Sequence, residues 1–82
     1  MLHKKSESEN QTEMNAPLNG KVVQINVTPG SKVVKGDALL VIESMKMENK
    51  ILAPRTASVE EIHVSVGSQV SLNQTLLTFK TN

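Results

Sequence analysis

The sequence predicts an all-β domain, a small flattened β-barrel or sandwich of two four-stranded antiparallel sheets with an internal pseudo-two-fold repeat. Three observations lead to this prediction. The chain has 82 residues, enough for one small hydrophobic core. Short runs rich in Val, Ile and Thr alternate with polar residues, and no apolar stripe recurs at the helical period of about 3.6 residues. The second half of the chain also repeats the first.

The repeat appears when the sequence is shifted by 37 residues, so that residues 16–45 lie over residues 53–82. Two copies are too few for a solenoid, and a closed pair related by an approximate two-fold axis fits better. Identical residues occupy the following pairs of positions: Ala16/Ala53, Pro17/Pro54, Val22/Val59, Ile25/Ile62, Val27/Val64, Gly30/Gly67, Ser31/Ser68, Val33/Val70, Leu39/Leu76 and Leu40/Leu77.

The first strand expected in each copy shows the two-residue apolar period of a half-buried strand. Residues 23–27 alternate apolar and polar side chains, and residues 62–66 do the same. Both patterns end at a glycine, Gly30 or Gly67, where a turn can use positive φ at little steric cost. Each copy therefore begins with a strand followed by a tight turn.

Two further strands are expected in each copy. Val33 and Val70 each mark a brief strand, followed by a Gly-Asp or an Asn-Gln turn pair. Residues 39–43 and 76–80 form longer strands, and we expect about eight short strands in the whole domain. The core expected from these strands consists of Val22, Ile25, Val27, Val33, Leu39, Val41, Val59, Ile62, Val64, Val70, Leu76 and Phe79.

Composition argues against several classes of function. A net charge of +1 is too weak for binding nucleic acid or an anionic membrane, and a single Phe without Trp or Tyr offers no stacking platform for bases. The absence of Cys excludes a disulfide scaffold and a thiolate metal site, and neither His3 nor His63 has a metal-ligand partner at usable spacing. No apolar run approaches the roughly 18 residues of a membrane span. We expect a cytoplasmic module without catalytic residues.

The sequence divides into a polar tail and one domain. Residues 1–13 contain too few apolar side chains to offset their ordering entropy, so we expect a flexible tail there and the domain in residues 14–82. Lys46 follows the first copy, and its repeat equivalent would fall one position beyond the C-terminus. Pseudo-symmetry therefore places Lys46 at one end of the barrel and both termini at the other, which suits a load at one end and a tether at the opposite end.

The residues around this connection carry a family resemblance. Residues 43–49 read ESMKMEN, and the copies begin with Ala-Pro. Over nearly all of residues 14–80 the chain resembles the biotinyl domain of biotin carboxyl carrier proteins and biotin-dependent carboxylases, whose signature is Ala-Met-Lys-Met. Ser44 replaces the signature alanine and is small, so we expect little effect. Ala57 stands where the family usually has glycine, which implies a local turn different from that at Gly20.

The resemblance implies the barrel-sandwich hybrid fold and biotin bound covalently to Lys46. Met45 and Met47 would then flank the lysine as recognition residues, with Ser44 and Glu43 completing the motif. The alternatives are that a methionine caps the core and that Glu43 is an ordinary solvated strand residue. The Met-Lys pair also lacks the Asn-Gly signal of a type I′ turn, so the backbone of this hairpin stays open.

The resemblance also implies a function and a set of partners. A biotin protein ligase would attach the biotin, a biotin carboxylase would charge it, and a carboxyltransferase would pass the carboxyl group to acetyl-CoA, another acyl-CoA or a keto acid. Fatty acid biosynthesis is one setting for such a non-catalytic carrier subunit. The polar tail lacks the Ala/Pro richness of many carrier linkers, which favours a free-standing small subunit.

Two alternatives share the expected fold. Lipoyl domains also load a lysine at this turn, typically within Asp-Lys-Ala, to carry acyl groups. Met45 in place of the acidic residue and Met47 in place of alanine favour biotin over lipoate. An unmodified structural version of the fold would have no reason to keep Met-Lys-Met. The biotin carrier is therefore the leading hypothesis, and the lipoyl carrier is the second.

Overall fold

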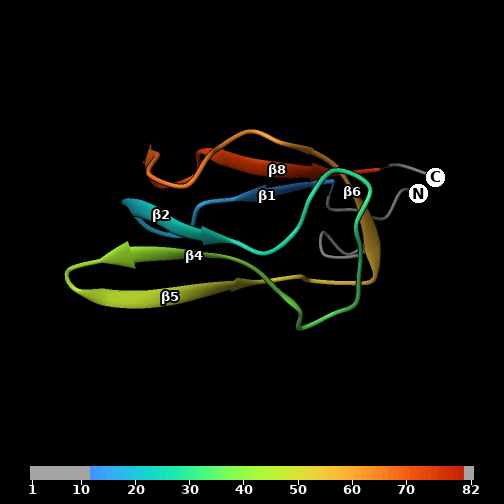
Figure 1. Ribbon diagram of the computed structural model, residues 1–82, viewed down its shortest axis with the longest axis horizontal. Coiled ribbons are helices and arrows are strands. Elements are labelled where there is room, and N and C mark those ends of the chain that lie inside the picture. The colour runs from blue at the N-terminus through green and yellow to red at the C-terminus, as the bar shows by residue number, and fades with distance from the viewer. Residues whose placement is uncertain (1–11, 81–82) are drawn as a thin grey trace, which may run out of the picture.

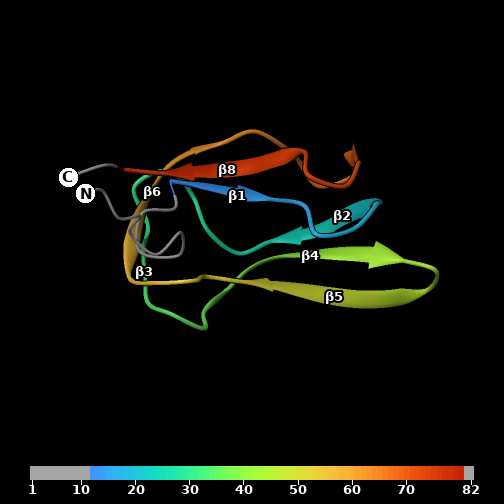
Figure 2. The ribbon, with the colours of Figure 1, turned by 180° about the vertical axis from the view of Figure 1, so that it is seen from behind.

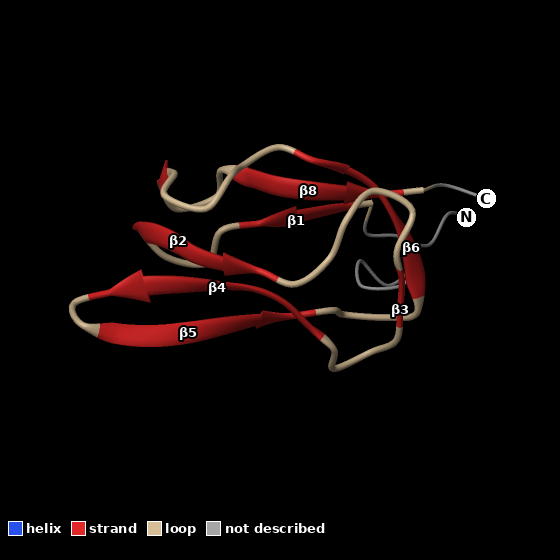
Figure 3. Cartoon of the chain, in the orientation of Figure 1, coloured by secondary structure: helices blue, strands red, loops and turns tan. Residues whose placement is uncertain are grey.

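The computed structural model describes residues 12–80, which form eight β-strands and no helix (Figures 1 and 3). The strands make two four-stranded antiparallel sheets, with the orders β1-β8-β6-β3 and β5-β4-β2-β7. The predicted all-β fold is confirmed. The strands are β1 (Glu13–Asn15), β2 (Gly20–Ile25), β3 (Lys32–Val33), β4 (Ala38–Ser44), β5 (Met47–Leu52), β6 (Ala57–Ile62), β7 (Gln69–Val70) and β8 (Thr75–Phe79).

The two sheets are pseudo-symmetric copies of each other. The repeat relates β2 to β6, β3 to β7 and β4 to β8, and it converts one strand order into the other. Each copy also gives its short strand to the opposite sheet. The turn glycines show this exchange, because Gly30 N donates to Val59 O at 2.8 Å and Gly67 N donates to Val22 O at 2.7 Å. The two copies therefore interlock.

The hydrophobic core fills the space between the sheets. Most of the predicted core is buried, while Ile25, Val27, Ile62 and Val64 are half-buried and pack at its margin. The prediction omitted several buried residues. Two of them, Leu40 and Ile42, lie where β4 does not alternate: residues 39–42 are all buried, so the two-residue period could not show which of them belong to the core. The omitted core residues are Ala16, Leu40, Ile42, Ile51, Ala53 and Leu77.

A β-bulge at the same place in both copies interrupts the predicted alternation. The register shifts between Val22 and Gln24 in β2 and between Val59 and Glu61 in β6. An extra residue in one strand allows side chains three positions apart to face the same side. Each fully buried valine is therefore followed three residues later by an isoleucine that also packs against the core.

The turns follow the repeat as well. Gly30 and Gly67 have φ of 95° and 98°, which confirms the predicted positive φ. The expected difference in turn between Gly20 and Ala57 is wrong, because each begins a strand directly after a three-residue bend. Glycine is needed at position 20 for close packing, since a Cβ there would lie 2.6 Å from both the Glu43 carbonyl oxygen and Ile42 Cγ2.

The hairpin of β4 and β5 lies at one end of the molecule, and the first and last described residues lie at the other (Figures 1 and 2). Phe79 N donates to Thr12 O at 2.8 Å, so these two ends of the described chain are adjacent. This arrangement agrees with the prediction that Lys46 and the termini lie at opposite ends of the domain. Residues 1–11 of the predicted tail lie outside the described residues, and the predicted boundary at residue 14 falls inside β1, which begins at Glu13.

Candidate functional site: the lysine hairpin

The candidate site is the hairpin formed by β4, β5 and the two residues that join them, Met45 and Lys46; we call it the lysine hairpin. Ser44 pairs with Met47 in the last rung, so the loop contains only two residues. Their φ angles are 53° and 67°. A two-residue loop with positive φ at both positions is the type I′ arrangement, whose twist matches that of the flanking strands. The structure thus settles the turn that the sequence left open.

Met45 and Lys46 adopt this turn without the residues that usually favour it. A left-handed conformation costs an L-residue roughly 1–2 kcal/mol. Neither side chain is branched at Cβ, which keeps the conformation accessible. The strands supply the compensating energy, because β4 and β5 pair without interruption from Leu40 and Ile51 up to the loop, and β4 is anchored by its buried side chains.

The loop side chains are presented to solvent. Lys46 is exposed, and the side chains beside it are 91% exposed at Met45 and 67% exposed at Met47. Neither methionine therefore caps the core, and both thioethers are accessible to a partner surface. Ser44, at the base of the loop, is half-buried.

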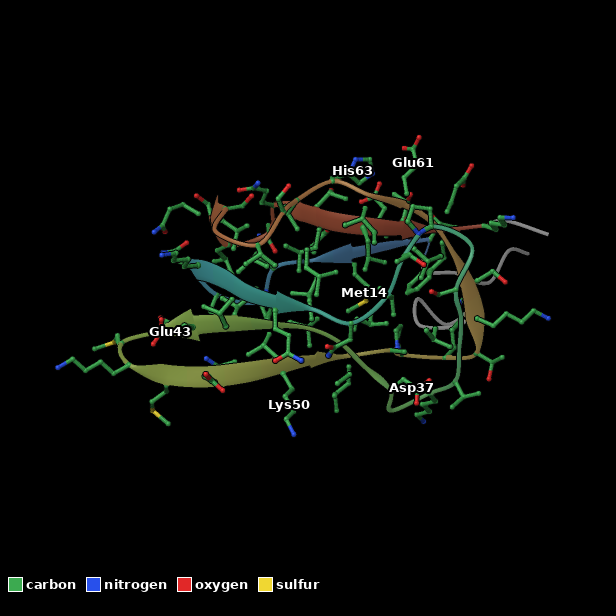
Figure 4. All side chains as sticks on the ribbon, in the orientation of Figure 1. Met14, Asp37, Glu43, Lys50, Glu61 and His63 are labelled. Atoms are coloured by element: carbon green, nitrogen blue, oxygen red, sulfur yellow. The ribbon has the colours of Figure 1, made fainter. Side chains whose placement is uncertain are left out.

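Charged side chains flank the hairpin. Glu43 and Glu48 are directly opposite each other on β4 and β5, and both are exposed. Lys21 on β2 is opposite Glu43 from the other side. Glu43 lies close to the loop and Lys50 lies further along β5 (Figure 4). Like charges directly opposite each other destabilise a strand pair, so this end of the sheet carries an unfavourable acidic pair that Lys21 offsets in part.

One residue of the site was missed by sequence reasoning. Asn49 is half-buried on β5, and its side-chain Nδ2 donates to the carbonyl oxygens of Ile42 and Met47, each at 3.3 Å. The sequence offered one signal for this residue: a polar side chain between Glu48 and Lys50, at a position whose side chain faces the core when its two neighbours face solvent. Its partners depend on the register of β4 and β5, which the sequence did not define.

The other candidate groups lie away from the hairpin. His63 Nε2 is 3.7 Å from Glu61 Oε1, and both side chains project from the other sheet and the segment after it (Figure 4). Among residues 12–80, no three His, Cys, Asp or Glu side chains are grouped so that they could hold a metal ion. In the same residues, no helix has the length and apolar character needed to cross a membrane.

The hairpin presents a primary amine, that of Lys46, to solvent. Lys46 stands on a short turn at the far end of a fixed ladder of strands, with an accessible side chain on each side. Such a fold and site suit a carrier domain, the class of protein in which a covalently attached group is presented at one end.

Comparison with known proteins identifies the family. The sequence profile of the biotin/lipoyl attachment family, described as "Biotin-requiring enzyme", matches residues 12–79. The chain belongs to this family, and the cofactor of the domain is biotin.

The curated relatives support the biotin branch of the family. The chain is 38% identical over 65 residues to the biotin carboxyl carrier protein of Streptococcus mutans, covering 79% of this chain and 50% of that protein. It is 37% identical over 70 residues to the human propionyl-CoA carboxylase alpha chain, covering 85% of this chain and 10% of that protein. It is 38% identical over 64 residues to human pyruvate carboxylase, covering 78% of this chain and 5% of that protein. The chain thus spans half or less of each of these relatives.

Two solved structures share the fold. A single-chain, multi-domain long-chain acyl-CoA carboxylase matches with a TM-score of 0.79 and 30% identity, over 85% of this chain and 7% of that one. The lipoyl domain of the 2-oxoglutarate dehydrogenase complex of Azotobacter vinelandii matches with a TM-score of 0.74 and 22% identity, over 85% and 96%. The second likeness concerns the fold alone.

Proposed function

We propose that this domain carries biotin on Lys46 and presents it in turn to a biotin carboxylase site and to a carboxyltransferase site. The observation that carries the proposal is the placement of Lys46 at the exposed tip of the lysine hairpin, between two exposed methionines. The opposite end of the domain holds the first and last described residues (Figure 1). A tether at that end would leave the modified lysine free to reach its partners.

The residues of the hairpin fit the attachment chemistry. An amide bond forms between Lys46 Nζ and the carboxyl carbon of biotin; Nζ gives up a proton, and the carboxyl oxygen leaves with the phosphate group that ATP provides for activation. A biotin protein ligase would supply this activation. When attached, biotin supplies a ureido nitrogen that accepts and donates carbon dioxide. The chain itself supplies reach and orientation.

A carrier of this kind acts through effective concentration. A tethered cofactor meets each partner site by an intramolecular step, so a weak contact suffices for delivery. The names of the relatives include carboxylases of propionyl-CoA and pyruvate, which supports an acyl-CoA or keto-acid acceptor in the complete system. The partner subunits would perform both carboxyl transfers and this domain neither. A role in fatty acid biosynthesis and a cytoplasmic location stay predictions.

A lipoyl carrier is the second candidate, and the likeness to a lipoyl domain is the observation that favours it. That likeness concerns only the fold, whereas the residues at the turn differ from Asp-Lys-Ala on both sides of Lys46. The biotin carrier is therefore the better supported function.

Intact mass after incubation with biotin protein ligase, biotin and ATP tests the proposal. We expect one biotinyl group on the parent chain and none on Lys46→Arg. The matched control is Lys50→Arg, which alters another exposed lysine of the same hairpin and should still gain one group. No gain by the parent chain, or gain of a lipoyl group only from a lipoate ligase, would contradict the proposal.

A further inference from the structure

The lysine hairpin extends beyond the support of its own sheet. On β4, the last residue that pairs with β2 is Glu43, opposite Lys21. Ser44 and Met47 therefore pair only with each other, and β5 is the edge strand of the sheet. The loop beyond them holds two residues at positive φ, and the rung below them is the acidic pair of Glu43 and Glu48. Each of these features weakens the end of the hairpin.

Asn49 connects the two strands at this weak point. It lies opposite Ile42, so both side chains face the same side of the sheet, toward the core. Its Nδ2 donates to Ile42 O across the strand pair and to Met47 O on its own strand, each at 3.3 Å. A single amide group thus links the part of β4 that is held by the core to the first residue after the loop.

We propose that Asn49 is a positioning residue for Lys46, whose side-chain amide holds the lysine hairpin closed in the shape that the ligase binds. The inference rests on the proposed function, since it concerns presentation of Lys46 for modification. Asn49 does not touch the reacting amine; it acts through Met47 and Ile42. An amide is required at this position because both partners are carbonyl oxygens, which accept hydrogen bonds from the two N–H groups of the side chain.

A positioning role has a kinetic signature. Without the amide, Lys46 keeps its chemistry but the hairpin occupies open shapes for part of the time. The ligase then binds only the closed fraction, so the apparent affinity falls by that fraction. Once bound, the lysine meets the same catalytic groups as before. Loss of Asn49 should therefore raise KM for the domain while leaving kcat unchanged.

Asn49→Asp tests this inference, because it keeps the shape of the side chain and replaces the donor with a carboxylate facing two carbonyl oxygens. We expect amide hydrogen exchange at Met47, which pairs with Ser44 in the last rung, to accelerate about tenfold when followed by NMR. KM in the ligase reaction should rise about tenfold with kcat within about twofold. Asn49→Ala removes the donor without adding charge and should show the same changes at smaller size.

The matched control is Asn26→Asp. Asn26 Nδ2 donates to Ala38 O at 3.2 Å. This variant therefore also loses an amide bond to a backbone carbonyl of β4, but at the end of β4 away from Lys46. This variant should leave hairpin exchange and KM unchanged. The inference is wrong if both Asn49 variants behave like Asn26→Asp, or if kcat falls while KM and hairpin exchange stay constant. Failure of the proposed function would appear differently, as a parent chain that the ligase does not modify, and hydrogen exchange would still test Asn49.

Discussion

Replacing Gly20 with alanine should destabilise the domain, although alanine occupies the equivalent position in the second copy. A Cβ at position 20 would lie 2.6 Å from the Glu43 carbonyl oxygen and 2.6 Å from Ile42 Cγ2, and 3.3 Å from the Glu43 carbonyl carbon. The Ile42 side chain is fully buried, and the Glu43 backbone is fixed by its pairing with Lys21 and Glu48. Neither neighbour can move without disturbing the packing of Ile42 or the pairing of β4 with β2 and β5.

The magnitude follows from two opposing terms. Inserting a methyl group into a well-packed site costs about 1–3 kcal/mol through shifts of backbone and side chains. Replacing glycine by alanine returns about 0.4–1 kcal/mol by restricting the unfolded chain. The net expectation for Gly20→Ala is a loss of about 1–2 kcal/mol, or a decrease in Tm of about 5–15 °C for a domain of this size.

Urea denaturation and a thermal melt, followed by circular dichroism, measure this loss. The urea midpoint should fall with an unchanged slope, which indicates a change in stability without a change in the surface exposed on unfolding. The matched variant is Ala57→Gly, which should cost at least about 0.5–1 kcal/mol because it adds backbone freedom and removes a partly buried methyl group that packs against the core. A Cβ should thus lower the free energy of unfolding at position 20 and raise it at position 57. A Gly20→Ala domain as stable as the parent would refute the argument from close approach.

Two further predictions concern a turn and the acidic pair. Gly36 has φ of 95° with open space around it, and its equivalent in the second copy, Asn73, has φ of 72°; Gly36→Ala should therefore cost about 1–2 kcal/mol in urea denaturation, and Gly36→Asn clearly less. Glu48→Lys places opposite charges across from each other at Glu43 and should stabilise the domain by about 0.2–1 kcal/mol at low salt. Repeating the melt in 1 M NaCl should remove most of that gain, whereas a gain independent of salt would argue against a charge effect.

The repeat made most of the fold predictable. Because identical residues recur at corresponding positions, the turn glycines Gly30 and Gly67 and the buried valines of each copy could be placed before the structure was considered. The bulges after Val22 and Val59 could not be placed, since an extra residue in one strand is defined only by the partner strand. The four buried residues 39–42 were ambiguous for a related reason, because a continuous apolar run carries no period.

The candidate site was predictable in its location and less so in its geometry. The spacing of the copies was enough to put Lys46 at the end opposite the termini. The type I′ turn was not predictable, because Met45 and Lys46 have no intrinsic preference for it and adopt it under the constraint of the β4–β5 pairing. Asn49 was missed because a side-chain bond to the neighbouring strand exists only in one register.

Pseudo-symmetry creates two ends of similar shape, and departures from the repeat make those ends chemically different. At the hairpin end, Lys21 is followed across the sheet by Glu43 and Glu48. In the corresponding row of the other sheet, Lys32 is opposite Ser58, and Lys80 N donates to Ser58 O, so lysines flank a neutral residue. Glu43 in one row thus corresponds to Lys80 in the other, so an acidic position in the first copy is basic in the second. A partner that binds this domain therefore meets a row of different charge at each end, and the row at the hairpin end leads to an exposed lysine on a two-residue loop.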